Sequence, residues 1–595
     1  MLPHSGDKCW KVPSAYVGGC LLLAACAMRA APATPQAEQS NAVDRAASDG
    51  TAGAEPAIRQ ALRPSLALTE RAQKDRAAEP ADPILERGHE LFTRQCAICH
   101  GDQGDGAGKF AYLMNPRPRN FQQGNFKLST TQNQIPTEED LIRTISRGMP
   151  GSAMPPWAHL PLSDLQALAK YVKRTHVEAV TAEAKAIAES AAGAAEWIAR
   201  RTRPGPALNV PPEPAFDDLR WFRGRRIYLE ACASCHGVDG HPVAEAVTFD
   251  NEGYPVPPRS FVNGIFKGGS EGHQLYVRIV KGINGTPMPS SDGVYKDDEV
   301  WDLIHYVQSL AKVGAQERAQ LRQGTLVAPS VVGTLPPDPT DPAWNQARPL
   351  YVGLTPLWWT EDRIEGLVVQ ALHNEQDLAL RFSWLDPEPD DRAVRQDEFR
   401  DAVAVQFALS SDPPFYMGDA GQHGGVNIWM WKADRQKNIA AGYQDVDAAF
   451  PDRAVDMYPE QDHRLADGSV TDRPRQAITR HAPEFITAWG AGNLVADPTM
   501  ATPVECLTAR GPGTLAGKPA NVQVVAGQAV YQRGVWYVQM QRTMELPHHG
   551  DHTAADERVF RSGDYLPVSF AIWNGSAGDR DGKKNISIWQ KLVIE

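Results

Sequence analysis

Two cysteines separated by two residues, with a histidine directly after the second, occur twice in the chain. The residues of the two motifs are Cys96, Cys99 and His100, and Cys232, Cys235 and His236. This spacing is typical of covalent haem attachment, in which both thiols add to the vinyl groups of the porphyrin and the imidazole binds the iron. The 595 residues include only 8 cysteines, and a redox dithiol needs no histidine at that position. The sequence therefore predicts two covalent haems c.

A methionine followed by proline comes after each motif at a nearly constant distance and predicts the distal iron ligand. Met154 lies 54 residues after the first histidine, and Met288 lies 52 residues after the second. A methionine opposite the histidine raises the potential of the iron. The stretch around Met154 resembles the Met–Pro loop of small class I cytochromes c. Met149 competes with Met154, but the second copy has a single methionine there. We therefore expect Met149 to cap the helix predicted at Glu138–Arg147.

The two motifs lie in copies of one helical unit. We place these units at 83–176 and 216–314, with a helical and proline-rich linker at 177–215. Matching stretches of the copies are Pro118–Phe121 with Pro258–Phe261, and Gly124–Lys127 with Gly264–Lys267. Apolar residues at helical spacing predict helices at Ile84–Phe92, Glu138–Arg147, Pro161–Lys173 and Asp297–Leu310. We therefore expect two all-α cytochrome c domains.

The first 26 residues have the features of an export signal. Lys8 and Lys11 precede a short apolar run that ends in Leu23–Cys26. This end resembles the lipobox of bacterial lipoproteins, which implies cleavage before Cys26 and a lipid on that cysteine. Secretion without lipid is the alternative. Residues 27–82 have almost no aromatic side chains and predict a disordered tether. We expect an exported protein on the periplasmic side of a membrane, anchored by lipid through Cys26.

From residue 335 to 595 the helical periodicity gives way to alternation of apolar and polar residues. Strand-like runs are Leu378–Trp384, Val522–Val525, Gly534–Met540 and Leu566–Trp573. Short strands between glycine, proline and aspartate turns predict an all-β antiparallel sandwich, with long loops over it at 440–515. The fold class is therefore two all-α cytochrome c domains followed by this sandwich. Cys9 and Cys20 lie in the predicted signal, so Cys506 is the one cysteine left without a role, and we expect it to be a small buried residue.

Several stretches of the region 335–595 resemble, in their order and residues, the haem-b-binding gamma subunits of ethylbenzene dehydrogenase and related periplasmic molybdoenzymes. They are Asp401–Phe407, Pro414–Gly418, Val426–Asp434, Trp573–Gly575 and Lys584–Trp589. In that family a methionine and a lysine bind the iron of a haem b in a cleft of the sandwich. The resemblance implies Met417 and Lys584 as ligands, with Lys583 as the alternative lysine and His423 as a reserve ligand. A lysine ligand must be neutral, which burial favours.

These features together predict a multihaem electron-transfer protein with two haems c and one haem b. The resemblance implies that it serves as a gamma-type subunit or redox partner of an exported molybdenum oxidoreductase. Catalysis would then belong to molybdopterin and iron–sulfur subunits, and electrons would pass on to other respiratory cytochromes. The first c haem, nearest the tether, is the expected outlet. A net charge of −12 without a basic aromatic cluster argues against nucleic acid as a partner.

Two other functions are compatible with the sequence. One is a dihaem cytochrome c fused to a sandwich that binds a ligand or another protein and holds no haem b. The other is a haem enzyme such as a peroxidase, which needs a haem with an open distal position. The methionines at matching positions in both cytochrome domains disfavour the enzyme, so we expect no catalytic residue in this chain.

Overall fold

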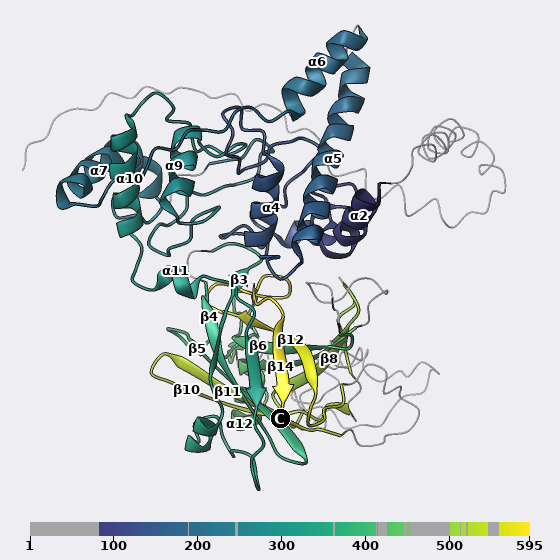
Figure 1. Ribbon diagram of the computed structural model, residues 1–595. Helices are drawn as coiled ribbons and strands as arrows, with labels where there is room; N and C mark the ends of the chain where they lie inside the picture. Colours follow the sequence, from purple (N-terminus) through teal and green to yellow (C-terminus); the bar gives the residue numbers. More distant parts are fainter. Residues whose placement is uncertain are drawn as a thin grey trace, which may run out of the picture. The chain divides into compact units, whose positions relative to one another are not determined.

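The computed structural model describes most of the chain from residue 82 onward (Figure 1). Within that span, the residues not described are 188–189, 244–247, 361–362, 412, 414–424, 445–448, 453–499, 512, 519–521 and 546–557. The predicted signal and all but the last residue of the tether, with Cys26, lie outside the described residues. Met417 and His423 lie outside them too. Within the described part, no helix has both the length and the apolar content needed to cross a bilayer.

The first helical unit is held by a close crossing of its first and last long helices. Its elements are α2 (Pro83–Gln95), α3 (Ala97–His100), η2 (Ala111–Leu113), α4 (Glu138–Arg147) and α5 (Leu162–Ile187). The Asp82 side chain accepts the Ile84 amide at 3.0 Å and so caps α2. Helices α2 and α5 touch at Gly88, where a Cβ would lie 2.2 Å from the Ala167 carbonyl oxygen. The absent side chain at Gly88 therefore lets the two backbones meet.

The second helical unit repeats this crossing. Its elements are α7 (Asp218–Ala231), α8 (Ala233–His236), α9 (Gly272–Lys281), α10 (Asp297–Ser309) and α11 (Ala315–Arg318). Helix α7 packs on α10 at Gly224, where a Cβ would lie 1.9 Å from the Asp302 carbonyl oxygen. The Asp302 carboxylate also accepts from Arg220 and Arg223 of α7. The two copies thus pack their first and last long helices in the same way, through a glycine of the first helix.

The predicted helices agree with these bounds, with one difference. Helix α4 has the predicted limits, because Thr137 and Asp140 form a capping box at its start and Gly148 ends it with a φ of 73°. Met149 therefore lies beyond the cap, and the expectation that it caps this helix is wrong. Helix α5 runs to Ile187, past the predicted end at Lys173. The first half of the expected linker helix belongs to α5, and α6 (Ala191–Thr202) forms the rest.

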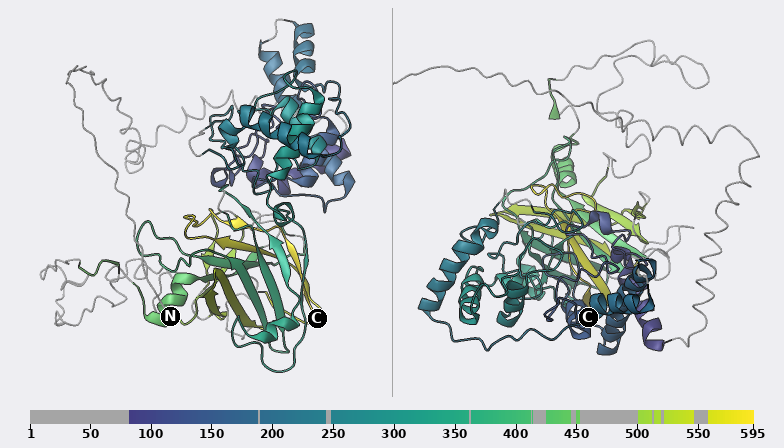
Figure 2. Two further views of the ribbon diagram at one scale, coloured as in Figure 1. Left: turned by 90° about the vertical axis from the view of Figure 1, so that its left-hand side faces the viewer. Right: turned by 90° about the horizontal axis from the view of Figure 1, so that it is seen from above.

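The C-terminal region contains two packed β-sheets (Figure 2). Among the described residues, the larger sheet has the order β1-β14-β12-β6-β7-β8-β9, with β13 beside β12 and β3. The smaller has the order β10-β11-β5-β4-β2. The strands of the larger sheet are β1 (Thr325–Ala328), β3 (Thr355–Pro356), β6 (Ala402–Ala408), β7 (Val426–Lys432), β8 (Val504–Ala509), β9 (Ala516–Gly517), β12 (Tyr565–Trp573), β13 (Asn585–Ile586) and β14 (Gln590–Ile594). Those of the smaller are β2 (Leu350–Gly353), β4 (Gly366–His373), β5 (Asp377–Leu385), β10 (Ala526–Gln532) and β11 (Val535–Thr543).

Large apolar side chains from both sheets fill the space between them. Trp429, Trp431, Phe407 and Phe382 are fully buried there, and Cys506 is 2% exposed, which confirms its expected role as a small core residue. Alternation along β6 sends Val403, Val405 and Phe407 into this core and leaves the alanines on the opposite face.

Four features of the β region differ from the predicted all-β antiparallel sandwich, and the first is that strand β8 (Val504–Ala509) lies inside the stretch 440–515 predicted as loops. Strand β1 pairs with β14 in parallel, which a local pattern of apolar residues does not reveal. A helix, α12 (Ala433–Ala441), follows β7 directly. The predicted strand Val522–Val525 is wrong, since strand β10 begins only at Ala526. The Gln523 side chain bonds the backbone amide and carbonyl of Cys506, which holds this stretch as a loop along β8.

Asp401 provides a test of how the strand ends are held. Its buried carboxylate accepts the amides of Asp390 and Gly575 at 2.7 and 2.9 Å and the indole of Trp536 at 3.0 Å. Asp401→Ala leaves these donors unsatisfied, so we expect a loss of about 2 kcal/mol or more in unfolding free energy. Thermal unfolding followed by tryptophan fluorescence measures it. Asp397→Ala, at an exposed site, is the control. Equal melting temperatures for the two variants would contradict this role.

Candidate haem sites

The histidine of each motif is held by the same backbone contact. Nδ1 of His100 lies 3.0 Å from the carbonyl oxygen of Arg119, and Nδ1 of His236 lies 3.0 Å from that of Arg259. A carbonyl can only accept, so each Nδ1 carries the hydrogen and Nε2 keeps its lone pair. Burial lowers the pKa of His100 to about 4 and lowers that of His236 as well. Both rings are therefore neutral and suited to bind iron through Nε2.

A phenylalanine supports each imidazole. The ring of Phe121 stacks on His100 with centroids 4.5 Å apart, and that of Phe261 stacks on His236 at 4.4 Å. A second phenylalanine stacks on the first in each copy, Phe126 at 6.0 Å and Phe266 at 5.7 Å. These aromatic stacks fix the plane of the imidazole in both units.

The attachment cysteines begin the short helices that carry the histidines. Cys96 ends α2 and precedes α3, and Cys232 stands in the same place between α7 and α8. Each motif is one turn, in which the histidine amide donates to the carbonyl of the first cysteine at 2.9 Å. This turn places both thiols and the imidazole on adjoining sides of one loop. Burial raises the pKa of the Cys96 thiol to about 12, so its surroundings favour an uncharged sulfur over a thiolate.

The two methionine loops have the same backbone form. In the first, the Met149 amide donates to the Met154 carbonyl at 3.1 Å, and in the second the Ile283 amide donates to the Met288 carbonyl at 3.3 Å. Met149 thus corresponds to Ile283, an aliphatic residue that cannot bind iron. Met149 and Met154 line the same cavity of about 500 Å³, so the cavity alone does not distinguish them, whereas the repeat favours Met154.

The larger sheet of the β region lines a cleft of about 770 Å³ on the face turned away from the sandwich core. Its floor consists of alternate residues of β6, β7 and β12, namely Ala402, Ala404, Ile428, Met430 and Ala571. Alanine at three of these positions leaves space above the strands. The cleft lies in the size range of roughly 300–1,000 Å³ typical of cofactor sites.

The two predicted lysines point in different directions. Lys584 lines the cleft, is 7% exposed, and has its Nζ 5.0 Å from the centroid of the Trp573 ring. Burial lowers the pKa of Lys584 to about 8, which makes the neutral amine accessible near neutral pH. Lys583 instead donates to the carbonyl oxygen of Ala577 and lies 3.9 Å from Asp579.

A loop after the first haem motif forms part of the cleft wall. The Phe110 amide donates to the Ile98 carbonyl inside the motif at 2.9 Å, and the Phe110 side chain lines the cleft. Further along the loop, the Asn115 amide donates to the Leu357 carbonyl at 3.1 Å, and the Leu357 amide donates to the Lys584 carbonyl at 3.1 Å. Hydrogen bonds thus connect the first motif, the loop and Lys584.

Sequence reasoning missed this loop and the two carbonyl acceptors. The Pro–Arg pair that recurs at Arg119 and Arg259 could have indicated the carbonyl acceptors, because a pattern present in both copies near a haem motif suggests a shared contact. No sequence signal indicated that Phe110 approaches the cleft, because Phe110 and Lys584 are more than 450 positions apart in sequence.

The geometry fits covalent haem in both helical units. Each presents a neutral imidazole with a free Nε2, two thiols in the same turn and a methionine loop of matching form. The cleft fits a flat apolar group approached by an amine. Within the described part of the chain, no three His, Cys, Asp or Glu side chains gather as a metal site.

Comparison with known families agrees with this division. Residues 83–172 match the model of cytochrome c oxidase, cbb3-type, subunit III, and residues 222–311 match that of cytochrome c. Residues 341–585 match the ethylbenzene dehydrogenase model. The chain therefore joins two cytochrome c domains to a domain of the ethylbenzene dehydrogenase family.

Individual relatives carry names of the same kind. The chain is 27% identical over 265 residues to the gamma subunit of dimethylsulfide dehydrogenase from Rhodovulum sulfidophilum, covering 42% of this chain and 73% of that protein. It is 25% identical over 263 residues to a Haloferax mediterranei protein named as a respiratory nitrate reductase heme subunit, covering 43% and 67%. A solved chain of the reducing HAO-like protein complex of Kuenenia stuttgartiensis is 35% identical, with 38% and 96% covered and a TM-score of 0.33. The protein is a multihaem electron-transfer protein.

Removal of the thiols tests the two attachment sites separately. Cys96→Ala with Cys99→Ala, and Cys232→Ala with Cys235→Ala, should each remove one covalent haem, because no thioether can form. Intact mass of the denatured chain and haem staining after gel electrophoresis measure the loss. Cys506→Ala, at a buried position in β8, is the control and should keep both haems. An unchanged mass increment in either double variant would refute that site.

Proposed function

We propose that the chain is the haem-carrying, gamma-type subunit of an exported molybdenum oxidoreductase. The observation that carries this proposal is the cleft with the buried Lys584, walled by the loop that follows the first haem motif. Substrate chemistry takes place on a partner with molybdopterin and iron–sulfur centres. This chain receives or delivers the electrons and connects the partner to other respiratory cytochromes. The names of the two relatives support such a partner.

Each cytochrome domain holds one haem c through its own residues. His100 and Met154 bind iron in the first, and His236 and Met288 bind it in the second. Bound haem supplies one-electron chemistry. The arginine carbonyls fix the imidazoles, and Met154 and Met288 would supply the second ligand to each iron, which would leave no open position for a substrate such as peroxide.

We assign the cleft to a haem b that Lys584 would bind through its amine, with Met417 as the second ligand that the family resemblance implies. The cation Lys583 has carbonyl and carboxylate partners on the neighbouring loop, which supports Lys584 as the lysine ligand. The buried Nζ of Lys584 has to be neutral when it binds iron, and its lowered pKa makes that state accessible. Met417 is assigned from the resemblance alone.

The contacts of the cleft support an order of the three sites. Phe110, Tyr112 and Leu113 of the first cytochrome domain line the cleft, whereas no described residue of 216–314 does. Electrons therefore pass between the cleft and the first cytochrome domain, and between the first and the second cytochrome domain. This differs from the expectation based on the tether, which made the first domain the outlet. The second domain takes that role. Export and a lipid on Cys26 keep the chain at the periplasmic side of a membrane.

Matched lysine variants test the cleft. Lys584→Ala should lose the extractable haem b or shift its spectrum, because the amine ligand is gone, while both haems c remain. Lys583→Ala, a neighbouring change of equal size and charge, should keep haem b. Visible spectra and acid–acetone extraction of the purified full-length protein give the result. Normal haem b in Lys584→Ala would contradict the ligand assignment, and its loss in Lys583→Ala alone would exchange the two lysines.

A further inference from the structure

The two cytochrome domains contact each other through matching arginines. Arg259 of the second domain donates to the carbonyl oxygen of Gly151 in the methionine loop of the first. Arg119 of the first domain pairs with Glu252 of the second at 3.3 Å. Arg119 also lies beside Gly285, where a Cβ would come within 3.3 Å of its Nη1. Gly151 and Gly285 occupy the same place in the two methionine loops. The contact is therefore reciprocal.

Two lysines at matching positions lie near these arginines. Lys267 is 9% exposed, and Lys127 is half-buried. Burial, with the neighbouring cations adding to it, lowers the pKa of Lys127 to about 7 and that of Lys267 well below its usual range. Asp250 and Glu252 oppose the effect at Lys127. Neither ammonium donates a hydrogen bond or forms an ion pair with any residue that the structure describes.

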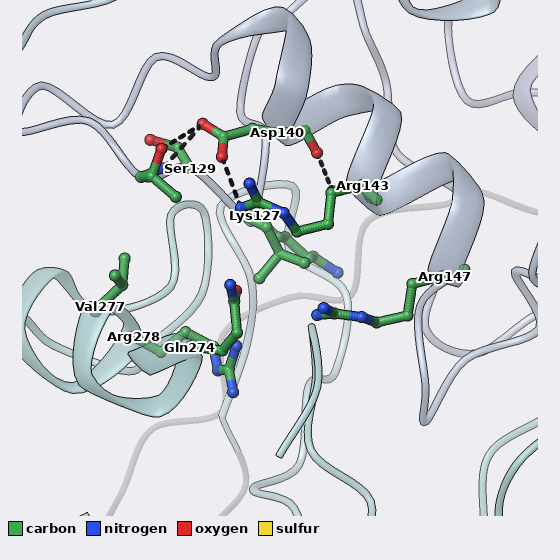
Figure 3. Close-up of a pocket in the computed structure, with 13 residues that line it drawn as sticks. Lys127, Ser129, Asp140, Arg143, Arg147, Gln274, Val277 and Arg278 are labelled. Carbon is green, nitrogen blue, oxygen red and sulfur yellow. Dashed lines mark hydrogen bonds and ion pairs between the residues drawn. The ribbon is translucent and has the colours of Figure 1, made fainter. Parts of the chain in front are cut away.

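Other basic side chains nearby do have partners. Figure 3 shows Lys127 close to Arg143 and Arg147 of α4 and to Arg278 of α9. Arg143 lies 3.4 Å from Asp140, Arg147 lies 3.7 Å from Glu271, and Arg278 donates to a backbone carbonyl. Within this cluster, Lys127 and Lys267 are therefore the cations whose charge no ion pair with the described residues compensates.

Such a buried, uncompensated pair of cations is unfavourable unless anionic groups lie against it. The backbone of the arginines indicates where those groups come from. His100 is bonded to the carbonyl of Arg119, and His236 to that of Arg259, so a porphyrin on either histidine lies beside the cluster. The ionised groups of a haem are its propionate carboxylates, which suit ammonium and guanidinium partners.

We propose that Lys127 and Lys267, together with Arg119 and Arg259, form one shared site for the propionates of both covalent haems. The two haems c then meet at the contact between the domains, which suits direct electron exchange. This rests on the proposed function only in that each domain carries a covalent haem. A cation beside haem attracts the added electron and stabilises the reduced iron, so its removal lowers the midpoint potential.

The test is a redox titration of the full-length protein in which Lys267→Met is compared with the native chain. We expect the reduction equilibrium of the haem in the second domain to weaken roughly tenfold and that of the first to weaken measurably as well. Lys127→Met should weaken the reduction equilibrium of the haem in the first domain roughly tenfold and that of the second measurably as well. Lys312→Met and Lys109→Met remove the same charge from exposed positions in the two domains and should shift neither potential. The attachment-cysteine variants assign the titration steps.

A shift confined to the haem of the mutated domain, or to neither haem, would overturn the shared site while leaving the haems and the proposed function intact. If the purified native protein lacked a covalent haem in either domain, that result would instead contradict the proposed function. Titrations with added inorganic phosphate at constant ionic strength distinguish propionates from a free anion. We expect no dependence on phosphate, and potentials that follow phosphate concentration would also overturn the proposal.

Discussion

The structure depends on the hydrogen bond from each haem-motif imidazole to the carbonyl of an arginine. The contact from His100 to Arg119, and its copy from His236 to Arg259, selects the tautomer with a free Nε2 and orients the ring. It also anchors the loop on which the stacking phenylalanines stand. The side chain of the same arginine then reaches the other cytochrome domain. One residue thus couples the imidazole that is predicted to bind iron to the contact between domains.

The β domain uses the two faces of one sheet for different purposes. Along β6, the larger side chains Val403, Val405 and Phe407 fill the core, and Ala402 and Ala404 face the cleft. Small residues on the cleft side leave room for a flat ligand, and large ones on the core side keep the strands stable without it. Lys584 enters this apolar space from the loop before β13. Burial of Lys584 disfavours the ammonium, so the neutral amine that an iron ligand requires becomes accessible.

Local patterns in the sequence were sufficient for the haem motifs and for most helices. The Cys–x–x–Cys–His turn, the helix at Glu138–Arg147 and the alternation along β12 are each set by neighbours in sequence, so they could be predicted. The parallel pairing of β1 with β14 and the loop at Val522–Val525 could not, because they depend on distant partners. The same holds for the cleft wall. Phe110 and Lys584 come together only through the packing of separate domains, and no spacing rule relates them.

The central claim is that three haems of two kinds are carried by one chain. It is tested most directly by pyridine haemochrome spectra of the purified native protein, taken before and after acid–acetone extraction. The account predicts that two haems c per chain stay with the protein and that one haem b per chain is extracted. An extract without haem would contradict it and would make the sandwich a binding module attached to a dihaem cytochrome.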